Sequence, residues 1–220
     1  MKKYALLIIA IITLTSMSLQ KPERIIFFGD SITAAGIRPG GYITLLQEQL
    51  QQQGKAGAFE LIGAGIGGNK VTDLFLRLEN DVLSKKPNTV VIWIGVNDVW
   101  HKSSNGTGTD PKKFPLFYSA LIEKIQATGA KVILCTPAVI GERTDYSNEQ
   151  DGDLNYYSNM IRSLASKYNT RLCDLRKLFL QYNLANNPEN KESGILTTDR
   201  VHLNASGNKL VADAMAKQLF

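Results

Sequence analysis

The sequence predicts a three-layer α/β/α sandwich built on a five-stranded parallel sheet. Short apolar runs alternate with amphipathic stretches along most of the chain. Such runs are typical of buried strands, and apolar residues at three- and four-residue spacing are typical of helices. Parallel strands need crossover segments, and crossover helices pack on both faces of the sheet. The alternation therefore favours helices on either side of one parallel sheet.

The strand pattern occurs five times and is weakest in the last segment, at residues 25–28, 59–62, 90–94, 132–135 and 171–175. Helical spacing is found between and after them, at residues 42–53, 72–83, 114–128, 154–168 and 205–219. Gly54 and Gly129 mark helix ends, and Pro87 marks another break. Long loops in a compact domain often carry function, which draws attention to the irregular stretches 100–113, 137–153 and 186–199.

The N-terminus has the composition of a secretory signal peptide. Two lysines precede an apolar run from Ala5 to Leu14, and the sequence Ser-Met-Ser follows at 16–18. The run is shorter than the roughly 20 apolar residues that span a bilayer. The alternative is an uncleaved membrane anchor, because the serines only partly match the cleavage pattern. We predict a signal peptide over 1–20, one domain over 21–220, no stable membrane insertion after cleavage, and a secreted or periplasmic location.

Charge and cysteine content narrow the possible partners. The 25 basic and 20 acidic residues give a formal net charge of +5, and no basic run is longer than a pair. This balance argues against nucleic acid as a partner. Cys135 and Cys173 each lie in an apolar segment predicted as a strand, which favours free buried thiols over a disulfide.

Polar side chains follow the first and third predicted strands. Ligands of open α/β sheets bind beyond the carboxyl ends of the strands. Gly29-Asp30-Ser31 follows the first strand, where Ser31 can be a nucleophile if a base reaches it. Gly95-Val96-Asn97-Asp98 follows the third, where the Asn97 amide can donate to a developing negative charge. Taken alone, either motif is equally compatible with a capping residue.

A glycine-rich loop, GAGIGGN at residues 63–69, follows the second strand. Glycines let the backbone approach a ligand closely and leave amides free to stabilise an oxyanion. Phosphate binding is disfavoured, because the loop lacks the lysine of the GxxxxGK[ST] motif. A dinucleotide fingerprint is expected on the first strand-to-helix turn instead, with an acidic residue about 20 positions further on.

Two histidines each follow an aspartate by three residues, at Asp98 to His101 and Asp199 to His202. In a tight turn this spacing lets the carboxylate hold the imidazole by one ring nitrogen and leaves the other free to accept a proton. His101 begins a stretch expected to be mobile, whereas His202 leads into the final helical pattern. We therefore expect His202 to be the base.

These segments resemble the signature blocks of the SGNH hydrolases, also called the GDSL esterase and lipase family. The four matching motifs are Gly29-Asp30-Ser31, Gly68-Asn69, Gly95-x-Asn97-Asp98 and Asp199-x-x-His202. They occur in the family's order, so the resemblance covers essentially the whole chain after residue 20. Ile32 stands where many members have leucine, which is a mild departure.

The resemblance implies a flavodoxin-like domain that cleaves carboxylic esters through an acyl-enzyme intermediate. Ser31 would be the nucleophile and His202 the base, oriented by Asp199. The backbone amides of Ser31 and Gly68 and the side chain of Asn97 would form the oxyanion hole. Neither a metal nor an organic cofactor is expected, and Asp30 and Asp98 would be structural.

Substrate is the least determined feature. Predicted export favours a short-chain ester, such as an acetyl ester of a small molecule or carbohydrate, over the family's lysophospholipase and thioesterase activities. A noncatalytic glycan-binding module on the same fold is the alternative from another class. A metal-dependent phosphoesterase would need a cluster of histidines and carboxylates, and the sequence contains only His101 and His202.

Overall fold

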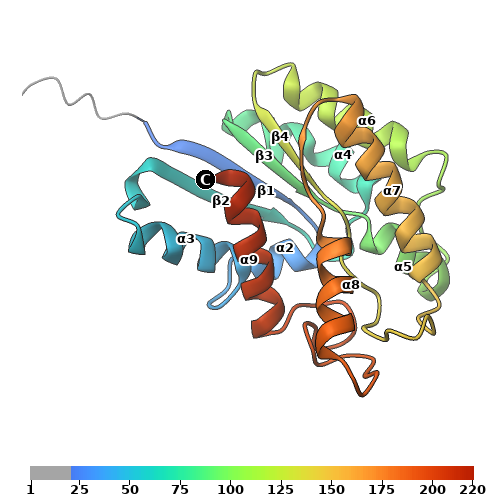
Figure 1. The fold of residues 1–220 in the computed structure, drawn as a ribbon. Helices are drawn as coiled ribbons and strands as arrows, with labels where there is room; N and C mark the ends of the chain where they lie inside the picture. The colour runs from blue at the N-terminus through green and yellow to red at the C-terminus, as the bar shows by residue number, and fades with distance from the viewer. Residues whose placement is uncertain (1–20) are drawn as a thin grey trace, which may run out of the picture.

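The computed structural model describes residues 21–220, which form one five-stranded parallel sheet flanked by helices (Figure 1). The strands run in the spatial order β2-β1-β3-β4-β5, and each neighbouring pair is parallel. This is the flavodoxin-like order, so the predicted architecture is confirmed. The predicted signal peptide lies outside the described residues. The strand bounds are β1 Glu23–Gly29, β2 Phe59–Gly65, β3 Thr89–Trp93, β4 Lys131–Cys135 and β5 Arg171–Cys173.

Helices cover both faces of the sheet. α3 and α9 pack together on one face, while α4, α6 and α7 lie side by side on the other (Figure 1). No helix within residues 21–220 combines the length and apolar composition of a membrane span. The helix bounds are α2 Ser31–Gly36, α3 Tyr42–Gln52, α4 Val71–Asp81, α5 Val96–Ser104, α6 Phe114–Gln126, α7 Asp151–Lys167, α8 Leu175–Asn186 and α9 Ala205–Leu219.

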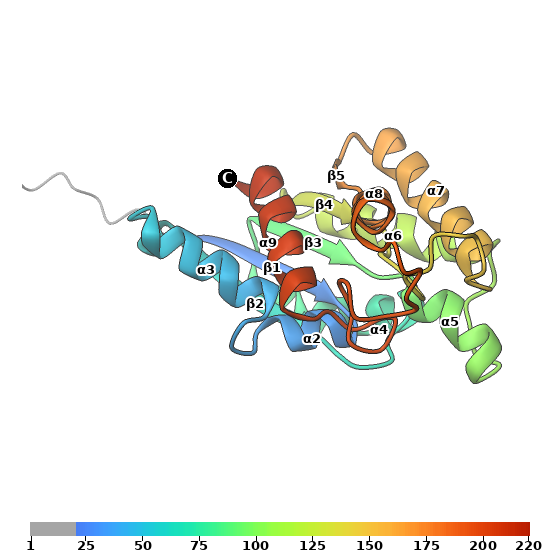
Figure 2. The same ribbon diagram turned by 60° about the horizontal axis from the view of Figure 1, so that its bottom comes forward.

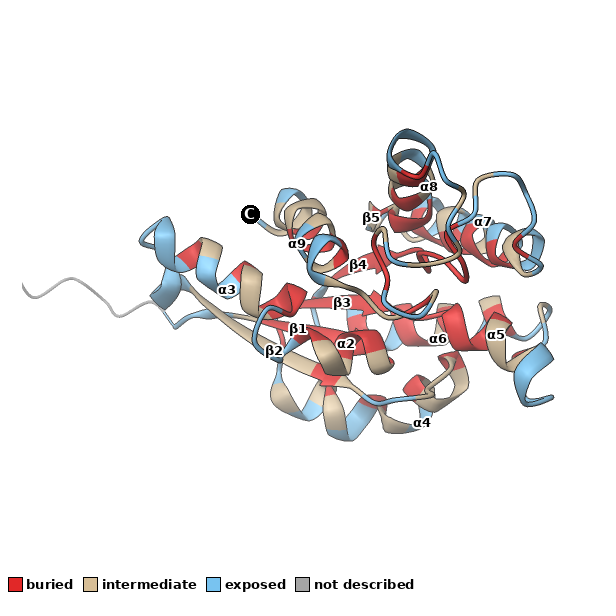
Figure 3. Cartoon of the chain, turned by 90° about the horizontal axis from the view of Figure 1, so that it is seen from below, coloured by how far each residue is buried: buried red, intermediate tan, exposed pale blue. Residues whose placement is uncertain are grey.

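The core lies along the central strands and the inner faces of the helices, where Figure 3 shows the buried residues in red. β1 and β3 are buried on both faces, which explains their continuous apolar runs. Tyr42 of α3 packs edge-on against Phe27 and Trp93, with ring centroids 5.9 and 5.5 Å away. Its hydroxyl donates to Thr33 Oγ1 at 3.1 Å. These contacts fix α2 and α3 to the sheet.

The cysteine prediction is confirmed within this core. Cys135 and Cys173 are both buried and free of a disulfide. They are paired in the register of β4 and β5. Both side chains therefore act as small apolar core groups.

The structure differs from the sequence predictions at four elements, of which α2 is a short helix that the helical spacing did not predict. The stretch expected to be mobile from residue 100 begins inside α5, so the prediction that His101 lies on a mobile loop is wrong. α8 was not predicted, and the last strand ends earlier than expected because Asp174 caps α8 by accepting from the Lys177 amide. Polar residues dilute the apolar pattern of α5 and α8, so packing against the domain decides their conformation.

Candidate active site

Three predicted site residues meet at the carboxyl edge of the sheet. Ser31 opens α2 directly after β1, while Asp199 and His202 lie in the segment that leads into α9 (Figure 2). Ser31 Oγ lies 2.9 Å from His202 Nε2, and His202 Nδ1 lies 2.7 Å from Asp199 Oδ2. This is the arrangement of a nucleophile, a base and a group that orients the base.

Asp199 holds both the backbone and the ring of His202. Its Oδ1 accepts from the amides of Val201 at 3.2 Å and His202 at 2.8 Å, while Oδ2 faces the ring. Arg200 between them has a φ of 83°, which closes the turn. Partial burial alone would raise the pKa of Asp199, but the hydrogen bonds from His202 outweigh it and lower the pKa. The carboxylate therefore stays charged and directs Nε2 toward Ser31.

The second histidine occupies a different place. His101 lies on α5 beside the glycine loop, where a Cβ on Gly68 would be 3.8 Å from its Cε1. Burial, followed by the charge of Lys70, lowers the pKa of His101. Among residues 21–220, it is His202 whose ring contacts the Ser31 hydroxyl.

The three expected oxyanion donors lie on neighbouring segments of this edge. Ser31 supplies the first amide of α2, a position without an intrahelical acceptor. A Cβ on Gly67 would lie 3.9 Å from that of Ser31, so the glycine loop runs beside Ser31. Asn97 is 3 % exposed, and its Nδ2 donates to Asn69 O at 3.1 Å. One N–H of this amide is thus engaged and the other is available.

The glycines of the loop serve two purposes. Gly68 has a φ of +76°, a left-handed conformation in which a side chain would be strained. At Gly65, a Cβ would collide with the backbone of Ala34, so the end of β2 packs directly on α2. The sequence suggested that these glycines admit a ligand. At Gly65 the close approach is to the nucleophile's own helix.

Asp30 and Asp98 are buried and accept from backbone amides, as expected. Asp30 Oδ1 accepts from Ile32 N at 2.9 Å and caps α2, and Asp98 Oδ1 accepts from Val71 N at 3.1 Å at the start of α4. Burial raises the pKa of Asp30 to about 7 and that of Asp98 to about 6. A fraction of each side chain therefore stays protonated near neutral pH.

Arg77 is a residue that the sequence analysis missed. From α4 its guanidinium donates to Gly29 O at 2.7 Å, Ala64 O at 3.0 Å and Asn69 Oδ1 at 2.7 Å. These acceptors lie at the end of β1, the end of β2 and the end of the glycine loop. Asn69 O in turn accepts from Asn97 Nδ2. The Arg77 side chain therefore links three of the four segments that carry motifs, two directly and the third through Asn69. The helical pattern over residues 72–83 gave no signal for this role, because it predicts an ordinary surface position at Arg77.

The sequence analysis also missed Glu142. It follows β4 in a long loop, yet it is only 1 % exposed. Its Oε1 accepts from the amides of Leu196 at 2.6 Å and Thr197 at 3.0 Å, and Oε2 accepts from Ile195 N at 2.9 Å. Three consecutive amides just before Asp199 are thus held by one carboxylate. A lone glutamate in a polar loop carries no pattern that could reveal this.

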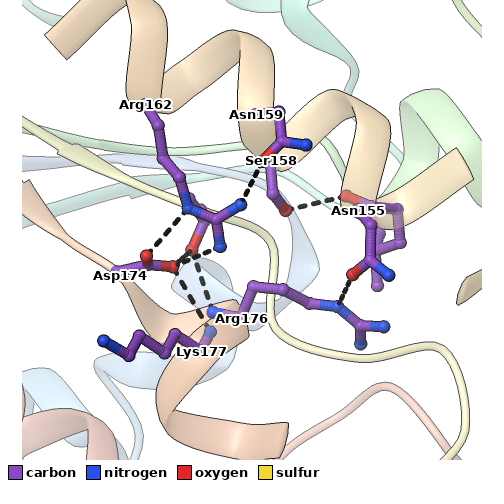
Figure 4. Close-up of polar contacts among 9 residues, drawn as sticks. Asn155, Ser158, Asn159, Arg162, Asp174, Arg176 and Lys177 are labelled. Carbon is purple, nitrogen blue, oxygen red and sulfur yellow. Dashed lines mark hydrogen bonds and ion pairs between the residues drawn. The ribbon is translucent and has the colours of Figure 1, made fainter. Parts of the chain in front are cut away.

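A cluster between α7 and α8 anchors the same loop from its other side (Figure 4). Arg176 is 1 % exposed and donates to Ala138 O at 3.1 Å and Asp151 Oδ1 at 2.7 Å. Arg162 donates to both carboxylate oxygens of Asp174, at 2.8 and 2.9 Å. The guanidinium groups are therefore used within the protein, which makes the cluster a structural brace.

A hollow of about 850 Å³ lies at the opposite edge of the sheet, where the strands have their amino ends. Its walls include Glu23, Phe59, Lys131 and Phe220, far from the carboxyl edge where such folds bind ligands. Within residues 21–220, no group of three His, Cys, Asp or Glu side chains is placed to hold a metal ion. The chemistry available at the carboxyl edge is that of a serine, a histidine and hydrogen-bond donors.

The model of the GDSL-like Lipase/Acylhydrolase family matches residues 27–210. The chain belongs to this family. The match spans β1 to α9 and so includes all four motifs. The chain is accordingly a hydrolase of carboxylic esters, and the resemblance to SGNH hydrolases is confirmed.

Individual relatives are acetylxylan esterases. The crystal structure of an acetyl xylan esterase, AlAXEase, is 64% identical, covers 90% of this chain and 100% of its own, and superimposes with a TM-score of 0.89. An acetylxylan esterase of Geobacillus stearothermophilus is 28% identical over 92% of this chain and 96% of its own. Solved catalytic mutants of an acetylxylan esterase from that organism replace a histidine or an aspartate three positions before it. They are 26% and 25% identical, cover 92% of this chain and 96% of theirs, and give TM-scores of 0.80 and 0.79.

The role of Glu142 predicts that Glu142→Gln slows catalysis as well as weakening the fold. An amide offers one acceptor oxygen where the carboxylate offers two, so at least one amide of the 195–197 segment loses its partner. We expect the free energy of unfolding to fall by about 1–3 kcal/mol. We expect kcat to fall roughly tenfold to a hundredfold, because His202 would be less well placed. Urea unfolding and ester kinetics well below the melting temperature measure the two effects.

Asp174→Asn is the matched control, because it also replaces a hydrogen-bonded carboxylate, a partly buried one that joins α7 and α8 instead. It should lower stability and keep kcat within about twofold. Equal losses of kcat in the two variants would show that Glu142 acts only through general stability.

The raised pKa of Asp30 predicts a pH-dependent cost of burying its charge. The folded state keeps the proton up to about pH 7, whereas the unfolded chain releases it near the ordinary aspartate pKa of 3.8. The folded state thus binds more protons between these values, so this group's contribution to stability falls as the pH rises through that window. Asp30→Asn keeps the cap and removes the titration. Its stability relative to the wild type should rise between about pH 4 and 7, by on the order of 4 kcal/mol in urea unfolding. A difference independent of pH would contradict the assignment.

Proposed function

We propose that this hydrolase removes acetyl groups from carbohydrate esters, with Ser31 as nucleophile. The observation that carries the proposal is the continuous contact from Ser31 Oγ through His202 to Asp199. The aspartate and histidine replaced in the catalytic mutants of the Geobacillus enzyme have the same spacing. Residue types, spacing and geometry therefore support the same three roles.

In the first half of the reaction, Ser31 Oγ attacks the ester carbonyl carbon while its proton passes to His202 Nε2. Asp199 stabilises the imidazolium that forms. The C–O bond to the sugar then breaks, and His202 returns the proton to the departing sugar oxygen. The acetyl group is left on Ser31.

In the second half, a water molecule attacks the acetyl carbon and gives its proton to His202. Acetate leaves as the Ser31–acyl bond breaks, and Ser31 recovers its proton. In both halves the negative charge on the carbonyl oxygen would be stabilised by the amides of Ser31 and Gly68 and by the free N–H of Asn97. Preorganised donors of this kind need no rearrangement during the reaction.

Two features support an acetylated carbohydrate as the substrate. The relatives at 64% and 28% identity act on acetylxylan by name. The site is also open, with His202 and Asp199 side chains 37% and 50% exposed, so an acetyl group on a bulky polysaccharide can reach Ser31. The lysines and apolar run within residues 1–20 support export, which would bring the enzyme to such polymers.

Acetate release from acetylated xylan tests the function. The wild type should release acetate and should cleave acetyl esters faster than dodecanoyl esters. Ser31→Ala should lose activity by at least roughly 10⁴-fold with an unchanged fold by circular dichroism. Faster cleavage of dodecanoyl or lysophospholipid esters would favour the lipase-like alternative, and a fully active Ser31→Ala would refute the nucleophile.

The position of the base is tested by comparing the two histidines. His202→Ala should lose roughly 10⁴-fold in kcat, because only His202 contacts the Ser31 hydroxyl. His101→Ala should change kcat by less than about tenfold and act mainly on KM. Asp199→Asn should cost less than His202→Ala, since the base would remain. The base assignment would fail if His101→Ala were the inactive variant.

A further inference from the structure

Charged side chains are distributed unevenly between the two edges of the sheet. All five strands are parallel, so the connections that enter them lie at the amino edge and those that leave them lie at the carboxyl edge. Counted to the first residue of each strand, the entering connections are residues 21–23, 53–59, 82–89, 127–131 and 168–171. They contain one acidic residue, Glu23, and six basic residues, Lys21, Lys55, Lys85, Lys86, Lys131 and Arg171.

The carboxyl edge has the opposite balance. The connections that leave the strands, together with the segment before α9, contain four basic and eight acidic residues. They span residues 30, 66–70, 94–95, 136–150, 174 and 187–204. Without Lys2 and Lys3, the 25 basic residues of the chain leave 23 in residues 21–220, against 20 acidic residues. The basic excess is therefore concentrated at the edge that faces away from Ser31.

The basic residues of the amino edge are available to a partner. Within residues 21–220, the ion pairs are made by other basic side chains. Arg24, at the start of β1, is one of these and neutralises Glu60 at 2.7 Å. All six basic residues of the entering connections except Lys85 are exposed. Their charges are therefore not compensated by neighbouring carboxylates in this part of the chain.

Three of these cations surround an exposed aromatic pair. Lys55, Lys131 and Arg171 line the hollow of about 850 Å³ at the amino edge. The rings of Phe59 and Phe220 also line it and meet edge-on, with centroids 4.7 Å apart, where the end of α9 lies beside the start of β2 (Figure 1). Phe220 is 41% exposed. Cations beside exposed aromatic rings match an interface of anionic headgroups and acyl chains.

The position of the amino edge favours a lipid surface over other polyanions. A polymer bound there would lie on the side of the domain opposite Ser31, so this surface does not serve the substrate. The chain enters the domain at this edge through Lys21, six residues after the apolar run that ends at Leu14. A signal segment at 1–20 would hold this edge, and not the carboxyl edge, against the bilayer until it is cleaved.

We propose that the amino edge of the sheet binds anionic lipid headgroups and holds the enzyme on a membrane surface with Ser31 facing the solvent. The binding is peripheral and needs no inserted helix. Each exposed lysine or arginine contributes weakly, so several act together. The attraction is electrostatic and weakens as salt screens it. The inference is independent of the proposed action on carbohydrate esters, because it concerns the opposite edge of the domain.

Partition of the full chain between buffer and sedimented vesicles tests this proposal. Vesicles of phosphatidylglycerol and phosphatidylcholine in equal parts are compared with phosphatidylcholine alone. The apolar run at residues 5–14 contributes to both partition coefficients, so their ratio isolates the effect of lipid charge. The wild type should give a ratio of roughly 100 at low salt, falling toward unity in about 1 M salt.

Two triple variants locate the surface. Replacing Lys55, Lys131 and Arg171 by glutamine should lower the ratio at least about tenfold. The matched control replaces three exposed lysines near the carboxyl edge that form no ion pair within residues 21–220, and it should keep the ratio within about threefold. Its changes are Lys112→Gln, Lys113→Gln and Lys177→Gln. Circular dichroism and cleavage of 4-nitrophenyl acetate should be unchanged in both variants.

Three results would overturn the assignment. The wild type could partition equally into both kinds of vesicle, which would remove the evidence for an anionic lipid partner. Equal losses in the two triple variants would show that net charge and not the amino edge determines binding. Tighter binding to polygalacturonate than to the anionic vesicles would make the partner an acidic polysaccharide.

Discussion

The carboxylate of Glu142 accepts hydrogen bonds from three consecutive amides of the segment that leads into α9. Neither the buried carboxylate nor these amides would be satisfied without the other. A buried carboxylate needs donors, and amides of a segment without regular secondary structure need acceptors. Each satisfies the other, and the amide of Glu142 and that of Gly141 add bonds to Glu192 O and Arg200 O, both at 2.9 Å. This pairing fixes where the turn of Asp199 and His202 lies, and the contact to Ser31 depends on it.

The segments that carry Ser31, Asn69 and Asn97 are also held in place because buried polar groups need hydrogen-bond partners. Arg77 satisfies carbonyls at the ends of β1 and β2 and the side chain of Asn69. Asp98 satisfies the first amide of α4. Because the supports are buried, the reacting groups can remain exposed without becoming mobile. An open site on a rigid frame suits the proposed reaction on acetyl groups displayed by a polymer.

Much of this arrangement could be predicted from the sequence. Buried strands on both faces of a sheet leave continuous apolar runs, and β1 and β3 were found on that basis. Capping aspartates and positive-φ glycines leave local signals as well, as at Asp30 and Gly68. Of the helices missed, α5 and α8 have sequences in which polar residues dilute the apolar pattern, so their conformation depends on packing. Glu142 was missed because the amides it binds lie 53 to 55 residues further along the chain. Arg77 was missed because its acceptors lie on three separate segments, one of them 48 residues away.

The sequence by itself determined the parallel α/β architecture, the identity of the motif residues and the expectation that they gather at one edge of the sheet. These follow from local periodicity and from the rule that parallel strands share a carboxyl edge. The sequence also pointed to His202 as the base, but only the tertiary structure placed its ring nitrogen against the Ser31 hydroxyl, since both histidines have the same spacing from an aspartate. This contact depends on where the segment before α9 is anchored, and that is set by long-range hydrogen bonds of buried polar groups, which no local pattern encodes.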